Sequence, residues 1–426
     1  MLTDDRAGAV VADERRIAAR PAVASDARTR LAVWSDHTAT WCLIGLAAIL
    51  PYAHTGRIQS TLLAGAIAGW VGRWYADRAF KWTRTPVDLP MALLVAWGIV
   101  ALVTAIDAAY SAREIKNELV TQAVLFVLGV SVARRKRDVA VLAWAVALAG
   151  LVMGGYALLA NGWNPTLIFS RGSRTSSFTS DPIFFSSYLV LAIPVAFYLV
   201  IASRRLVARW SAWAIWLVQL LALVSTVTRA AWLAVILQFL LYGLLRSRRV
   251  LVVWVFAVVG GLAIVASQPE LQRALVANGW FSDAGRMVFW ENLLNRFGDS
   301  PVSGFGYGQE TPERAAPGVR KATPAIDSTH AFNSFLEMAI ELGLVGLGLF
   351  GWVLWRVALT LWKGFRDAPT HSTDAAWLVC MVMVFAGFVL RNQVDHLFRD
   401  APGHLFWILM GLGVGRAVAR PSDPAS

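Results

Sequence analysis

The side chains best suited to chemistry in this sequence are four arginines and one histidine that flank long apolar segments. The arginines are Arg171, Arg174, Arg229 and Arg286. They have no matching carboxylates, and a guanidinium group donates two parallel hydrogen bonds to phosphate oxygens while staying charged at any working pH. The set therefore indicates an anionic ligand, and a pyrophosphate carried by a membrane lipid would lie at this depth.

Arg229 is the sharpest of these candidates because the segment STVTRAAW leaves almost no loop around it. Apolar sequence on both sides places the charge at or near membrane depth, where it costs several kcal/mol unless it is paired or solvated. A functional role is therefore favoured, and the alternative is an arginine that extends to the outer headgroups. For Arg171 and Arg174 the alternative is an ordinary solvated loop.

His330 is the candidate for proton transfer, since an imidazole can take a proton near neutral pH. It lies in the segment THAFNSFLE, three residues before Asn333. A single histidine near a helix start is often a structural hydrogen-bonding residue. The arginines predicted on the same face favour a catalytic role instead.

Further polar residues follow the eleventh apolar segment, and they are Arg391, Asp395, His396 and Arg399. A glycine-rich stretch, GFGYG at 304–308, lacks the lysine and hydroxyl residue of a phosphate-binding loop and is predicted to be a turn with a structural role. The outer segments contain no paired carboxylates of the kind a divalent metal requires. We therefore predict no metal and no cofactor.

These residues must be positioned by a membrane domain. Of the 426 residues 57% are hydrophobic and only 15% are charged, whereas soluble domains carry roughly 25% charged residues. The mean hydropathy is +0.55. Apolar segments long enough to suggest about 12 transmembrane helices lie at 38–54, 60–75, 88–106, 119–133, 138–160, 183–202, 210–227, 230–246, 249–267, 332–362, 374–391 and 403–418. The prediction is an all-α polytopic membrane protein.

The net charge of +12 follows the same organisation, because the basic residues gather in short clusters after every second apolar segment. This alternation predicts cytoplasmic even-numbered loops and cytoplasmic termini, and it argues against a nucleic-acid partner. The domain prediction is a cytoplasmic tail at 1–30, helices 1–9 at 31–267, a long outer loop at 268–331, helices 10–12 at 332–418 and a tail at 419–426. Cys42 and Cys380 lie in apolar segments and indicate neither a disulfide nor a zinc site.

The long outer loop contains one predicted amphipathic helix at 283–297, capped by Asp283. Its apolar stripe is predicted to pack on the membrane domain, and it consists of Met287, Trp290, Leu294 and Phe297.

In order along the chain, these features resemble the bacterial O-antigen ligase family, which shares a superfamily with the O-antigen polymerases. The resemblance covers about 165–415. It is carried by Arg174 to Pro182, the TRAA segment at Arg229, Gly285-Arg286 with Trp290, GFGYG, His330 with Asn333, and RNQVDHLF. Phe332 stands where many relatives have a second histidine, which leaves His330 as the only histidine of that motif.

The resemblance implies a GT-C-like glycosyltransferase of the bacterial inner membrane with a periplasmic active site. Such ligases transfer a polysaccharide from undecaprenyl pyrophosphate to the lipid A–core acceptor, with inversion and without a metal. By this resemblance Arg171, Arg174, Arg229 and Arg286 bind the pyrophosphate, and His330 is the general base. Asn333, Arg391 and Asp395 are assigned to the acceptor side or to orienting roles.

Three alternatives stay open at this stage. An O-antigen polymerase would use the same donor with a glycan acceptor, and a protein O-oligosaccharyltransferase would use a protein acceptor. A transporter of lipid-linked glycans is the alternative from another class, although it predicts charged or broken segments near the middle of the membrane.

Overall fold

The computed structural model describes residues 28–77, 82–160, 175–179, 181–269, 272, 281–316 and 330–419, with the side chains of 265 and 281–286 outside the description. Within these ranges the regular secondary structure is entirely helical, which agrees with the predicted class. The chain divides into two compact units, one of 1–46 and 56–83 and one of 47–55 and 84–426.

The first unit pairs a helix that begins at residue 28 with α2 (Gly56–Ala76). The two helices approach closely at Gly69, where a Cβ atom would lie 2.6 Å from the Ala39 backbone nitrogen. Arg73 and Asp36 form an ion pair across the same interface. A small residue and one charge pair therefore fix this pair of helices.

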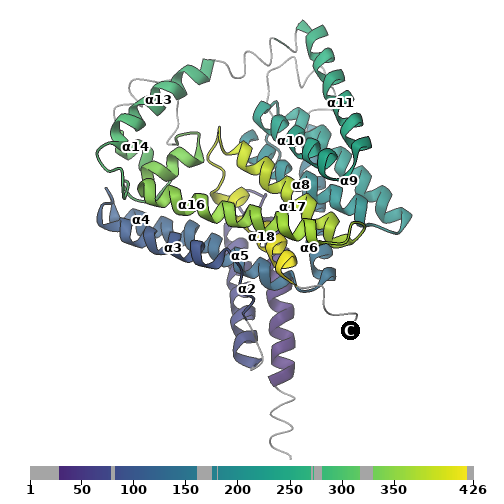
Figure 1. Ribbon diagram of the computed structural model, residues 1–426, viewed down its shortest axis with the longest axis horizontal. Helices are drawn as coiled ribbons and strands as arrows, with labels where there is room; N and C mark the ends of the chain where they lie inside the picture. The colour runs from purple at the N-terminus through teal and green to yellow at the C-terminus, as the bar shows by residue number, and fades with distance from the viewer. Residues whose placement is uncertain are drawn as a thin grey trace, which may run out of the picture. The chain divides into compact units, whose positions relative to one another are not determined.

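The second unit holds the other helices of the described residues (Figure 1). They are α3 (Asp88–Val100), the 3₁₀-helix η1 (Ala101–Val103), α4 (Ala108–Glu114), the π-helix η2 (Ile115–Val120), α5 (Thr121–Val132), α6 (Lys136–Ala160), α8 (Pro182–Ala202), α9 (Leu206–Ser225), α10 (Arg229–Arg246), α11 (Arg248–Ser267), α13 (Phe281–Phe297), α14 (Thr311–Ala315), α16 (Ser334–Asp367), α17 (Thr373–Arg391) and α18 (Asp400–Val418).

Each of the twelve predicted apolar segments is helical over most of its length. Among the described residues, seven helical stretches are by themselves long and apolar enough to cross a membrane, and they are Ala108–Val132, Lys136–Ala160, Pro182–Ala202, Leu206–Ser225, Arg229–Arg246, Ser334–Asp367 and Thr373–Arg391. The chain is therefore a polytopic membrane protein.

Helix α8 is the centre of the second unit and packs against α6, α9 and α17. It begins where Asp181 accepts a hydrogen bond from the backbone nitrogen of Ile183 at 2.7 Å, with Pro182 at the first helical position. Nearly all its side chains are buried. Tyr188 donates a hydrogen bond to the Val146 carbonyl at 2.8 Å. An apolar helix buried on all sides in this way is expected at the core of a bundle.

Helices α5 and α18 approach closely at glycines, and the rings of Phe126 and Trp407 also pack edge to face between them. A Cβ atom on Gly129 would lie 2.6 Å from the carbonyl oxygen of Ile408, and one on Gly411 would lie 2.2 Å from that of Phe126. Gly415 follows Gly411 by one helical turn on the same face. Small residues at this spacing let two membrane helices approach closely.

Helix α16 is broken at Gly343, whose φ of 68° and ψ of −170° are not helical. A Cβ atom there would lie 2.1 Å from the Val302 carbonyl oxygen, and Leu344 donates a backbone hydrogen bond to Pro301 at 2.9 Å. The segment from Pro301 thus fits into the break. The apolar segment 332–362, predicted as one span, is therefore a short helix to Leu342 followed by a long one that packs on α3.

Helix α13 confirms the predicted amphipathic helix, but it begins at Phe281, so Asp283 lies inside it and is not its cap. Its buried face also differs from the predicted stripe. Met287 and Leu294 are 68% and 58% exposed, whereas Phe289 and Leu293 are 5% and 0% exposed. Trp290 packs beside the buried pair, as predicted. The prediction was wrong for Met287 and Leu294, because α14 and α16 contact the neighbouring face of the helix.

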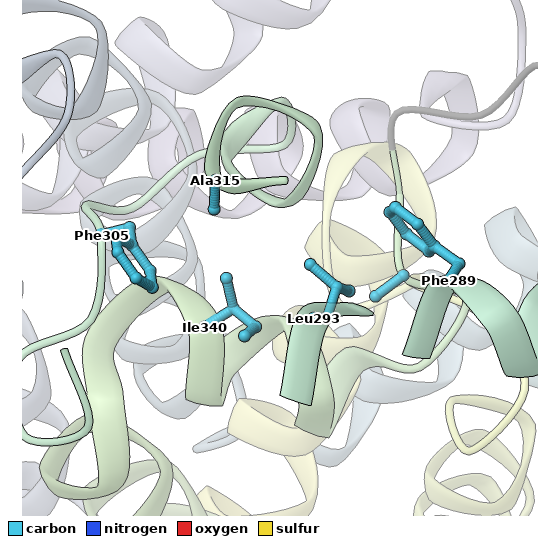
Figure 2. Packing of buried hydrophobic residues seen from close by; sticks show 6 residues of the cluster. Phe289, Leu293, Phe305, Ala315 and Ile340 are labelled. Atoms are coloured by element: carbon cyan, nitrogen blue, oxygen red, sulfur yellow. The ribbon is translucent and has the colours of Figure 1, made fainter. Parts of the chain in front are cut away.

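Figure 2 shows the cluster that forms this contact, with Leu293 between Phe289 and Ile340, and Phe305 on the far side of Ile340. Ala315 of α14 completes it. The cluster joins α13, the glycine-rich segment and the first part of α16. Because Ala331 also belongs to the cluster, the backbone directly after His330 is packed against it.

Candidate functional site

The candidate site lies where α16 begins. Asn333 caps this helix, because its Oδ1 accepts hydrogen bonds from the backbone nitrogens of Phe335 at 2.9 Å and Leu336 at 3.1 Å. The Ala331 nitrogen donates to Glu337 Oε1 at 2.9 Å. Phe332 has a φ of 52°, which is uncommon for a residue with a side chain. These features turn the chain sharply, and His330 stands just before the turn.

The RNQVDHLF segment is clamped to the same helix start. Ser334 donates backbone hydrogen bonds to the carbonyls of Asn392 at 3.1 Å and Asp395 at 3.0 Å, and its hydroxyl donates to Asn392 Oδ1 at 2.7 Å. Leu397 donates its backbone N–H to that same Oδ1 at 2.7 Å. Two segments about 60 residues apart in the chain are thus fixed together by polar contacts.

This clamp stacks two histidine rings. The rings of His330 and His396 have centroids 3.6 Å apart and an interplanar angle of 26°. Gln309, the residue after GFGYG, places its side-chain amide nitrogen 3.2 Å from His330 Nε2. An amide N–H donates, so His330 Nε2 is the acceptor and the ring proton lies on Nδ1 in this arrangement.

Both rings are held in the neutral form. Burial and then the positive charge of Arg399 lower the pKa of His330 to about 4, against a slight opposing effect of a hydrogen bond with the Gln309 backbone. Burial and then the His330 ring lower the pKa of His396 to about 2. A neutral imidazole keeps a lone pair, so the site can accept a proton at neutral pH.

Arg399 is a buried arginine that contacts three of the elements around the site. It forms a buried ion pair with Glu341, lies 3.9 Å from Glu114, and its guanidinium carbon is 4.3 Å from the centre of the Tyr307 ring. A single cation therefore connects α16, α4 and the glycine-rich segment. Removing one member of such a buried pair leaves an uncompensated charge.

The GFGYG segment has the structural role that the sequence predicted. Phe305 and Gly306 donate backbone hydrogen bonds to the carbonyls of Ile340 at 2.9 Å and Glu341 at 3.0 Å. Gly306 has a φ of 103°, and a Cβ atom there would lie 2.5 Å from the Ser111 hydroxyl. The segment fits between α4 and α16 only without side chains at its glycines, and it delivers Gln309 to His330.

Below the histidines lies a small cavity of about 20 Å³, lined in part by Glu337, Glu341, Arg399, Gln122 and Tyr307. This volume holds about one water molecule. Glu337 borders both this cavity and the histidine pair. Glu337 thus connects the histidine pair to a cavity whose remaining lining is mostly apolar.

His330, His396 and Glu337 each offer a possible metal ligand atom, and these atoms lie within 4.8 Å of one another. The ring geometry does not suit a shared ion. Planes inclined at 26° with centres 3.6 Å apart meet about 8 Å from the rings, whereas a metal bound to imidazole lies about 3 Å from the ring centre. One ring would have to rotate before both could bind the same ion.

The other predicted residues fall into three groups. Arg229 is half-buried at the first position of α10. Arg391 and Asp395 form a buried ion pair with each other, which gives them a structural role in the clamp. Arg171 and Arg174 lie outside the described residues. The side chains of Asp283 and Arg286 are also outside the description. The structure therefore brings His330 and Asn333 together with Arg391 and Asp395.

Sequence reasoning missed Gln309 and gave His396 no role. The only signal for Gln309 was its position directly after GFGYG, and the only signal for His396 was its place in the polar group after the eleventh apolar segment.

The fold and the site together define a polytopic membrane protein with a neutral histidine pair at a helix start, set above buried carboxylates and an arginine. Residues 214–351 match the family described as O-antigen ligase. This segment is about a third of the chain, and over it the chain is similar to this family, whose members are membrane glycosyltransferase-like enzymes. The matched segment contains Arg229, Arg286, Gln309 and His330. A comparison with curated proteins finds no match.

Proposed function

We propose that this protein is an O-antigen ligase that transfers a polysaccharide from undecaprenyl pyrophosphate to lipid A–core. The observation that carries the proposal is the neutral, half-buried His330, held by Gln309 and His396 within a segment of the O-antigen ligase family. A base fixed in this way suits the removal of a proton from an acceptor hydroxyl.

In the proposed reaction the acceptor oxygen attacks the anomeric carbon of the donor sugar from the face opposite the pyrophosphate. His330 takes the hydroxyl proton on Nε2, where the acceptor hydroxyl replaces the side-chain amide of Gln309 as the hydrogen-bond donor. The bond between the anomeric carbon and the phosphate oxygen breaks, and its electron pair leaves with the pyrophosphate. Attack from the opposite face inverts the anomeric centre, and the step requires no metal, cofactor or ATP.

The donor itself strengthens the base. A pKa of about 4 makes His330 a weak proton acceptor while the site is empty. An anionic pyrophosphate close to the ring favours the imidazolium form and so raises this pKa. Proton transfer to His330 then becomes favourable only when the donor is bound. Without the donor, His330 stays unprotonated at neutral pH.

We assign binding of the pyrophosphate leaving group to Arg174, Arg229 and Arg286, together with Arg171. Guanidinium groups would neutralise the charge that builds on the pyrophosphate as the bond breaks. The position of Arg229 at the first turn of α10 supports this assignment, since the N-terminus of a helix also attracts anions.

The proposed setting is the bacterial inner membrane, with about 12 crossings in a GT-C-like arrangement, cytoplasmic termini and a periplasmic active site. The long loop at 268–331 would lie on the periplasmic side together with His330. The seven membrane-length helices and the basic clusters of the sequence support this topology.

The deciding experiment is a gel of lipopolysaccharide from a host that lacks the gene, with lipid-linked glycans extracted in parallel. Loss of every O-antigen band, with long chains accumulating on undecaprenyl pyrophosphate, supports the ligase. Core that carries a single repeat unit would identify a polymerase instead, and an unchanged ladder would refute both activities.

Complementation with variants then tests the base. His330→Ala should abolish O-antigen transfer because the base is lost. Arg229→Ala should also abolish it, because the charge on the departing pyrophosphate is no longer neutralised. His371→Ala is the matched control, because His371 is exposed and lies away from the site in sequence, and it should restore a full ladder. Full activity of a well-expressed His330→Ala protein would remove His330 as the base.

A further inference from the structure

His396 is a buried histidine whose ring nitrogens have no hydrogen-bond partner within the described part of the chain. Its exposed fraction is only 7%. Buried polar side chains in folded proteins are almost always hydrogen-bonded, and each exception calls for an explanation, such as a ligand or a bound water. The nitrogens of His396 are therefore buried and unpaired, and a group that binds beside His330 is a candidate partner for them.

The neighbouring histidine cannot supply this partner. An imidazole donates and accepts in the plane of its ring, and the two rings face each other at 3.6 Å with an angle of only 26°. The stack therefore excludes a direct hydrogen bond between the rings. It also holds a nitrogen of one ring within 4.8 Å of a nitrogen of the other, so a molecule that reaches this nitrogen of His330 is within reach of His396.

The charges around His396 favour a neutral ligand group. Arg391 is already paired with Asp395, and Arg399 is already paired with Glu341. Each guanidinium therefore already has a carboxylate partner. The low pKa of His396 keeps the ring neutral, so it offers one N–H donor and one lone-pair acceptor. A hydroxyl group also offers one donor together with acceptor lone pairs.

We propose that His396 is a second substrate-contacting residue, whose ring hydrogen-bonds a sugar hydroxyl of the glycan that lies against His330. The inference rests on the proposed glycan transfer and adds a specificity contact to it. The clamp of Ser334 to Asn392 and Asp395 fixes the ring before the substrate arrives, and pre-positioned groups bind at lower entropic cost.

The test compares two substitutions in the purified full-length protein in lipid vesicles. His396→Phe keeps an aromatic ring that can stack on His330 but removes both nitrogens. His396→Gln keeps a donor and an acceptor but removes the ring. We expect the phenylalanine variant to lose at least about tenfold in kcat/KM, and the glutamine variant to lose less, because a buried hydroxyl without a partner is costly.

Acceptor and donor sugars without single hydroxyls identify the contacted group. One such deoxy substrate should slow the wild type about as much as His396→Phe does, and should slow His396→Phe no further. Loss on a deoxy acceptor assigns the contact to the acceptor, and loss on a deoxy donor assigns it to the donor. Wild-type rates with His396→Phe, or no deoxy substrate that matches its loss, would overturn the inference.

A binding measurement separates this inference from the proposed function. Quenching of tryptophan fluorescence by the core oligosaccharide and by the lipid-linked glycan reports binding without transfer. A wild type that binds glycan but transfers none refutes the ligase, while weaker binding by His396→Phe still supports the contact. Equal binding by the wild type and both variants, together with equal rates, refutes the contact alone.

Discussion

Lowering the pH from about 7.5 to about 5.5 should leave kcat/KM for glycan transfer almost unchanged. The quantity kcat/KM reports the ionisation of the free enzyme, and in the free enzyme burial and the charge of Arg399 lower the pKa of His330 to about 4. With this pKa about 97% of the ring is neutral at pH 5.5, whereas with the ordinary value of 6.5 only about 9% would be neutral.

The assay is transfer by the purified protein in vesicles, with initial rates measured from about pH 4.5 to about pH 8. The acceptor should be an oligosaccharide without phosphate monoesters, because these groups titrate near pH 6 and would mimic an enzyme group. The expected profile is flat down to about pH 5.5 and falls below it. A tenfold loss by pH 5.5, with a midpoint near 6.5, would refute the environment described for His330.

Folding has its own pH dependence, which the assay must exclude. The pKa of His330 is lower in the folded protein than its ordinary value of 6.5, so between these values the unfolded chain binds more protons. The folded state therefore has its full stability above pH 6.5 and loses part of it as the pH falls towards 4. Size-exclusion profiles at each pH, followed by a return to pH 7.5, separate reversible titration from unfolding.

Three further predictions concern the architecture. Gly343→Ala should destabilise the protein by roughly 2–4 kcal/mol, because a Cβ atom would lie 2.1 Å from the Val302 carbonyl oxygen at a φ of 68°. Gly348→Ala in the same helix is the control and should be neutral. Equal melting temperatures of the two variants would refute the break in α16. Arg399→Met should cost about 3–5 kcal/mol by leaving Glu341 unpaired, and the double variant with Glu341→Gln should recover part of this loss in a thermal size-exclusion assay; strictly additive losses would contradict the pair. Gln309→Ala should lower kcat/KM roughly three- to tenfold, the value of one hydrogen bond of about 1 kcal/mol, with unchanged melting, and an unchanged rate would remove Gln309 from the site.

The glycine-rich segment illustrates how far local sequence could be interpreted. Its glycines predicted turns, and the structure confirms a structural role with backbone bonds to Ile340 and Glu341. Nothing in GFGYG predicted that the segment fits into a break at Gly343, because that break depends on backbone atoms of residues about 40 positions away. A single helical span was the simplest interpretation of 332–362, since the apolar pattern continues through the glycine.

The sequence by itself determined the all-helical class, the positions of the apolar helices, helix α13, the resemblance to the O-antigen ligase family, and His330 as the candidate base. These features depend on composition, periodicity and motif order, which are local properties of the chain. The tertiary structure decided which face of α13 is buried, that Asn333 caps α16, and that Arg391 pairs with Asp395. It also decided that His330 stacks on a histidine 66 positions later, because such contacts arise from the packing of distant segments and leave no periodic signal in the sequence.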